Sequence, residues 1–100
     1  MKKWHFITNH GLMLLYVSQN AQCTMRDMAA ALGVTERSIQ RILKDLEGEG
    51  YITWQATGKG NIYEINHTRE LKHELTRDLI VGDLLDLLGR KKKKEVGKMR

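Results

Sequence analysis

Six side chains that can donate hydrogen bonds lie within one ten-residue stretch of the chain: Thr35, Arg37, Ser38, Gln40, Arg41 and Lys44. An Arg fork matches the two acceptors on a guanine edge, a Gln amide matches an adenine edge, and hydroxyl or ammonium groups suit phosphates. The stretch carries a net charge of +2, with Glu36 as its one acid. Residues 1–89 carry a net charge of −1 and residues 90–100 a net charge of +6, so positive charge within the body is local to these donors.

Apolar residues at helical spacing place these donors on the outer side of a helix. Thr35 is a good N-cap, so the pattern predicts a helix over residues 35–46. Its inner face consists of Ile39, Ile42, Leu43 and Leu46.

A second helix is predicted directly before it. Thr24 and Asp27 have the spacing of a capping box, and Gly33 is suited to a left-handed helix stop. Ala29 is small enough for the place where two helices cross, and Val34 completes the turn. This arrangement predicts a helix-turn-helix whose second helix can enter a major groove. The alternative is a three-helix core with a merely solvated charged face.

The flanking segments complete a mainly α fold with a β-hairpin wing. A first helix is predicted from Thr8 or Asn9 to near Asn20, which gives a three-helix core. Residues 51–54 and 61–65 have the period of strands and are joined by a glycine-containing loop over 55–60. In that loop Thr57 and Lys59 could contact a DNA backbone, although the hairpin could also simply cover the core.

After Asn66 the pattern predicts a long C-terminal helix through about Leu88, stopped by Gly89. Its leucines lie on two different faces, so one face should pack on its own domain and the other on a partner, or the chain should bend near Gly82 with Asp83 as a cap. We expect the segment to form a homodimer interface, with a monomeric fold-back as the alternative. The expected interface residues are Leu71, Leu75, Leu79, Leu84, Leu85 and Leu88.

Other classes of function find little support in the composition. No apolar run approaches the length of a membrane span, so we expect a cytoplasmic protein without a membrane partner. Cys23 is the single cysteine and is better explained by packing than by redox sensing. The four histidines show no metal-ligand spacing. No nucleophile motif, phosphate loop or carboxylate pair is present, so we expect no enzyme, no metal and no cofactor, and no small-molecule effector can be named.

Residues 8–66 resemble the winged-helix domain of MarR-like transcriptional regulators. The resemblance rests on the stretch TMRDMAAALGVTERSIQRILKDLEGEGYI (24–52) and on the NIYEI strand (61–65). Segments 6–10 and 71–88 also resemble small stand-alone regulators with this domain. The resemblance implies a winged-helix dimer that binds operator DNA. The wing departs from the usual pattern, because it has one basic residue where these regulators carry two or more arginines.

Three hypotheses follow for the chain as a whole. The leading one is a sequence-specific regulator of transcription that binds double-stranded DNA as a homodimer on an inverted repeat. The second is a winged-helix module that binds another protein, and the third is RNA binding through the tail and wing. We expect a DNA-binding domain over 1–66, a dimerisation segment over 67–89 and a disordered basic tail over 90–100, which could follow phosphates.

Overall fold

Three threonines set the starts of the first three helices in the computed structural model, which describes residues 5–89. Thr8 caps α1 (Asn9–Gln19), Thr24 caps α2 (Met25–Leu32) and Thr35 caps α3 (Glu36–Gly48). Each hydroxyl accepts a hydrogen bond from the backbone N–H three residues later, at 3.0–3.2 Å. Because these signals are local, all three helix starts were predicted from the sequence.

The turn between α2 and α3 depends on Gly33, which has a φ of 72° and ends α2 in the left-handed conformation. The N–H groups of Gly33 and Val34 both donate to the carbonyl of Ala29, at 2.9 and 3.1 Å. Met28, Ala29 and Ile39 are buried where the two helices cross. The predicted helix-turn-helix is therefore confirmed, with α3 beginning one residue later and ending two residues later than expected.

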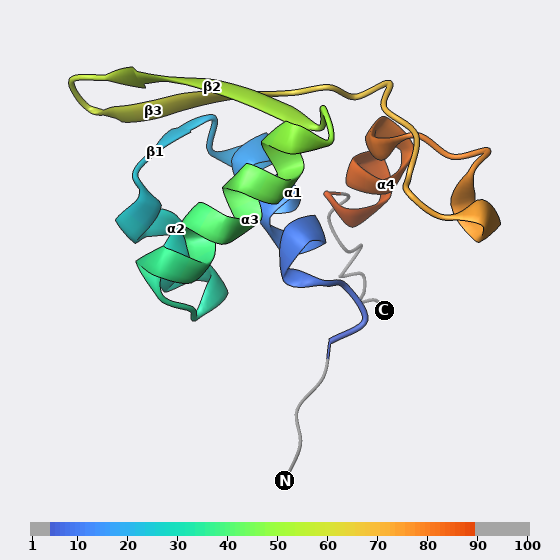
Figure 1. Ribbon diagram of the computed structural model, residues 1–100, viewed down its shortest axis with the longest axis horizontal. Helices are drawn as coiled ribbons and strands as arrows, with labels where there is room; N and C mark the ends of the chain where they lie inside the picture. Colours follow the sequence, from blue (N-terminus) through green and yellow to red (C-terminus); the bar gives the residue numbers. More distant parts are fainter. Residues whose placement is uncertain (1–4, 90–100) are drawn as a thin grey trace, which may run out of the picture.

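A three-stranded antiparallel sheet lies along one side of the helices (Figure 1). The predicted hairpin is present as β2 (Ile52–Thr57) and β3 (Gly60–Ile65), and its turn is only Gly58 and Lys59. A short strand β1 (Gln22–Cys23), which the sequence did not indicate, pairs with β3. Gly60 has a φ of 108°, and a Cβ there would lie 2.9 Å from the carbonyl oxygen of Cys23, so this pairing requires glycine.

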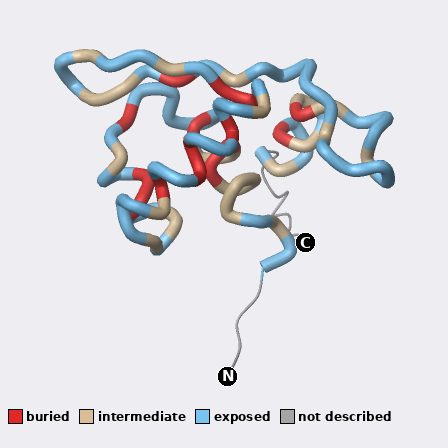
Figure 2. The backbone as a smooth tube through the Cα atoms, in the orientation of Figure 1, coloured by how far each residue is buried: buried red, intermediate tan, exposed pale blue. Residues whose placement is uncertain are grey.

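One hydrophobic core unites the helices, the base of the hairpin and the C-terminal region (Figure 2). The inner face of the hairpin contributes Ile52 and Tyr63, which are 1% and 3% exposed. The fully buried side chains from the other elements are Met13 and Val17 of α1, Met28 of α2, Ile39 of α3 and Val81.

The predicted long C-terminal helix is wrong. Residues 66–80, here called the return segment, form an irregular loop with one 3-10 turn, η1 (Glu74–Thr76), and only Val81–Leu88 form a helix, α4. An isolated bridge between Glu70 and Ile80 closes the loop. This path brings Val81 and Leu85 into the core and leaves Leu75 and Leu79 of the other leucine face exposed.

The alternative of a bend followed by a short helix describes the chain better. Asp83 accepts a hydrogen bond from the N–H of Ile80 at 3.1 Å and so stabilises the start of α4. The predicted basic tail over 90–100 lies outside the described residues. None of the described helices is both long and apolar enough to span a bilayer.

Candidate nucleic-acid interface

Helix α3 is held by one face and leaves the opposite face to solvent. Ile39, Ile42, Leu43 and Leu46 are each at most 6% exposed and pack into the core. Burial of four such side chains contributes about 1.5–3 kcal/mol each to folding, so the orientation of α3 is strongly determined. The outer side chains thus form a rigid stripe, here called the recognition stripe, of Arg37, Gln40, Arg41 and Lys44.

All four members of the recognition stripe are exposed. Among the described residues, none of these four side chains makes a hydrogen bond or an ion pair. Their donors are therefore available to an external ligand without loss of an internal contact. The stripe can present two guanidinium groups, an amide and an ammonium group to a single groove.

The two predicted hydroxyl contacts have different roles in the structure. The Thr35 hydroxyl accepts from the N–H of Ser38 and donates to the Ser38 hydroxyl at 3.1 Å, so it is engaged in capping α3. The hydroxyl hydrogen of Ser38 remains available to a phosphate. Glu36 lies beside them on the first turn of α3, with its carboxylate 3.9 Å from Arg26 of α2.

At the tip of the wing, the hydroxyl of Thr57 is used inside the hairpin. It donates to the carbonyl of Gly60 at 2.7 Å and accepts from the N–H of Lys59 at 3.1 Å. Gln22 of β1 also donates to it, at 3.4 Å. Thr57 therefore shapes the turn, whereas the exposed Lys59 is the tip residue whose charge faces solvent.

The leucines expected at a dimer interface differ widely in exposure. Leu85 is 6% exposed and belongs to the core of its own chain, which corrects its expected place at an interface. Leu71, Leu84 and Leu88 are half-buried. Leu75 and Leu79 are 87% and 46% exposed, so these two are the most exposed of the six expected residues.

Cys23, His10 and His73 have contacts within the fold that do not point to a redox or metal site. Burial raises the pKa of the Cys23 thiol, with a smaller contribution from the Asp27 carboxylate, so the thiolate is disfavoured. His10 pairs with Asp45 at 2.9 Å, and Nδ1 of His73 accepts the N–H of Leu75 at 3.0 Å. Within residues 5–89, no cluster of three or more His, Cys, Asp or Glu side chains could hold a metal ion.

Comparison with known protein families identifies the family to which the chain belongs. Residues 8–99 match the family described as the sugar transport-related sRNA regulator N-terminal domain. The chain belongs to this family. No curated protein matches it.

A solved structure shares the fold of this regulator domain. A single-residue mutant of S. aureus MepR bound to an oligodeoxyribonucleotide is 18% identical, with a TM-score of 0.51, and the alignment covers 93% of this chain and 65% of that one. S. aureus MepR bound to ethidium bromide is 18% identical with a TM-score of 0.49, covering 95% of this chain and 71% of that one. The chain thus spans less than two thirds of the first of these structures. The predicted winged-helix fold is confirmed by the first of these structures.

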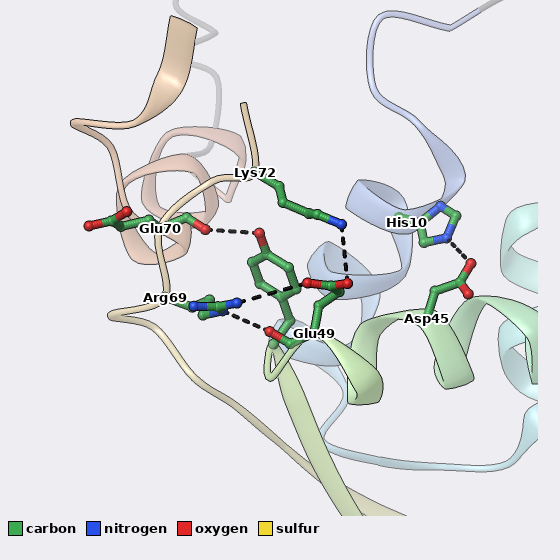
Figure 3. Close-up of polar contacts among 7 residues, drawn as sticks. His10, Asp45, Glu49, Arg69, Glu70 and Lys72 are labelled. Carbon is green, nitrogen blue, oxygen red and sulfur yellow. Dashed lines mark hydrogen bonds and ion pairs between the residues drawn. The ribbon is translucent and has the colours of Figure 1, made fainter. Parts of the chain in front are cut away.

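The regulator domain also contains a polar network that the sequence analysis missed, centred on Glu49 at the end of α3 (Figure 3). The Glu49 carbonyl accepts from Nε of Arg69 at 2.7 Å, and its carboxylate lies 3.1 Å from Nζ of Lys72. The Tyr51 hydroxyl donates to the carbonyl of Glu70 at 2.8 Å, and the Arg69 guanidinium lies 5.6 Å from the Tyr51 ring centroid. The network joins the return segment to the end of α3.

A hollow of about 430 Å³ lies beside this network, between α1, the end of α3 and the C-terminal region. His10 and Asp45, whose pair is drawn in Figure 3, are among the residues that line it. Its apolar lining comes from Leu14, Leu46, Leu71, Val81 and Leu84. Neither the network nor the hollow has a signal in the sequence, since both depend on the path of residues 66–81.

Proposed function

We propose that this chain is a sequence-specific regulator of transcription that binds double-stranded DNA by inserting α3 into the major groove. The observation that carries the proposal is the recognition stripe. It presents four unpaired hydrogen-bonding side chains on a helix whose other face is anchored in the core. A major groove about 12 Å wide admits one α-helix, and its base edges present the acceptors that Arg and Gln recognise.

Each side chain has a role that follows from its chemistry. Arg37 and Arg41 would pair with guanine edges, and Gln40 with an adenine edge. Lys44 and the Ser38 hydroxyl would bind phosphates and set the register of the helix in the groove. Lys59 at the wing tip would add one backbone contact. The fold is also that of S. aureus MepR, a mutant of which has been solved bound to an oligodeoxyribonucleotide, and this supports the proposal.

We further propose that two copies bind an inverted repeat. Two-fold protein symmetry matches a palindromic site when the two recognition helices lie one helical turn apart, about 34–36 Å. Leu75 and Leu79 are the apolar side chains we place at the contact between copies, because they are exposed in the single chain. Residues 70–88, which include them, carry a net charge of −3, and this suits a surface turned away from DNA.

The test is selection of bound duplexes from a random DNA pool at near-physiological salt. Enrichment of an inverted repeat with half-sites about one turn apart is the expected result. Arg41→Ala should lose the preference at one base pair of each half-site, whereas Arg77→Ala should keep the full preference, because Arg77 lies in the return segment, outside the recognition stripe. Bound DNA without an enriched sequence would refute specific recognition. Retention of no duplex would refute DNA binding and favour a protein partner.

A further inference from the structure

Arg26 of α2 lies next to the recognition stripe but is not part of it. Its side chain is 87% exposed, and Nε lies 3.9 Å from a carboxylate oxygen of Glu36, the first residue of α3. Glu36 precedes Gln40 by one helical turn, so the pair lies at the edge of the stripe. The pair also lies at the N-terminal end of α3, which is the end that contacts base edges in a helix-turn-helix.

The Arg26–Glu36 pair does little to hold the fold together. An exposed pair at this distance contributes between nothing and a small fraction of the stability of a domain. Met28 and Ala29 of α2 and Ile39 of α3 are buried in one hydrophobic core, and together with the turn at Gly33 this core already joins α2 to α3. The Arg26 guanidinium is therefore free to change partner at low cost.

A DNA phosphate is a better partner for that guanidinium than the Glu36 carboxylate is. When a recognition helix enters the major groove, the preceding helix crosses the phosphate backbone. A guanidinium can bind a phosphate through two parallel hydrogen bonds and releases condensed counterions when it does so. Glu36, in contrast, has a negative charge that would face the same phosphates.

We propose that Arg26 exchanges the Glu36 carboxylate for a backbone phosphate when DNA binds, and that Glu36 thereby weakens binding. The inference rests on the proposed DNA-binding function and extends its surface from α3 onto α2. In this proposal Arg26 raises the affinity for DNA of any sequence and does not contribute to sequence preference. Glu36 has a competing role, as the one acid between Thr35 and Lys44.

The chain offers a matched control. Arg77 and Glu74 form a second exposed Arg–Glu pair, 3.8 Å apart, within and just after η1. Substitutions there change the net charge of the chain as much as substitutions at Arg26 and Glu36 do. They leave α2 and α3 unaltered but lie beside Leu75, so the oligomeric state of these variants is measured as well. Where it equals that of the unaltered chain, they separate a local phosphate contact from a general electrostatic effect.

The experiment measures the affinity of the full chain for duplex DNA between about 50 and 200 mM salt. The test variants are Arg26→Ala, Glu36→Gln and the double variant, and the control variants are Arg77→Ala and Glu74→Gln. Arg26→Ala should weaken binding to all duplexes alike and reduce the slope of log affinity against log salt by about 0.9 per bound copy. The advantage of the unaltered chain should then shrink about 3.5-fold per bound copy across that range. Glu36→Gln should strengthen binding about two- to fivefold, and this gain should be smaller in the double variant, because Glu36 then has no Arg26 to compete for and only its direct repulsion of phosphate is relieved.

Several results would overturn the inference. If Arg26→Ala leaves the salt slope unchanged, Arg26 does not bind a phosphate. If Arg77→Ala changes the affinity and the salt slope as much as Arg26→Ala does, the effect comes from the net charge of the chain. Weaker binding by a Glu36→Gln variant that folds normally by circular dichroism would make Glu36 a contact to DNA. These outcomes leave the proposed function intact, whereas failure of the unaltered chain to bind any duplex would refute both.

Discussion

Two leucines of the C-terminal region provide a test of its architecture with one and the same substitution. Leu85 is 6% exposed and packs in the core, whereas Leu75 is 87% exposed. Leu→Ala in a core removes buried methyl groups and leaves a cavity, at a cost of about 2–5 kcal/mol. The same change at an exposed position costs about 0.5 kcal/mol or less. Since the free energy of unfolding of a domain is about 5–15 kcal/mol in total, Leu85→Ala should remove a large part of that stability.

The assay is equilibrium unfolding in urea at low protein concentration, followed by circular dichroism. Low concentration keeps association between copies from contributing to the apparent stability. A loss of about 3 kcal/mol corresponds to a fall in Tm of about 12–24 °C for a domain of this size. Equal costs for Leu75→Ala and Leu85→Ala, or a cost below about 0.5 kcal/mol for Leu85→Ala, would refute the packing of α4 into the core.

Three further predictions concern other parts of the chain. Arg41→Ala should cost about 1–3 kcal/mol of binding free energy and relax specificity at one base pair, whereas equal losses on all duplexes would make Arg41 a phosphate contact. Thiol-labelling kinetics at about pH 8 should show a folded-state Cys23 much slower than the same thiol in urea, because burial raises its pKa; fast labelling of the folded chain would contradict this. The N–H and hydroxyl of Thr24 lower the pKa of Asp27, so its contribution to stability is present above its unfolded pKa and is lost as the pH falls through the folded one. Asp27→Asn should therefore reduce the loss of stability below about pH 4 in acid unfolding curves, and an unchanged curve would contradict that role.

Much of the candidate site was predictable because its determinants are close in sequence. The recognition stripe follows from apolar residues spaced three and four apart, which make the opposite face of a helix solvent-exposed. Lys59 is recognisable because glycines flank it in a turn. The hydrogen bonds of the Thr57 hydroxyl with Gly60 and Lys59 are local to the turn, whereas its contact with Gln22, on another strand, had no local signal. The proximity of Arg26 and Glu36 likewise depends on the crossing of α2 and α3.

The sequence alone determined the first three helices, the turn at Gly33 and the hairpin, because caps, left-handed stops and hydrophobic periodicity act over one or two turns of chain. Only the tertiary structure decided the course of residues 66–88. The leucine pattern there is compatible with a long helix, and the choice depends on whether Val81 and Leu85 reach a core built from distant residues. The same holds for β1, whose two residues pair with β3, far along the chain. Contacts of that separation have no local signature, so the fold as a whole selects them.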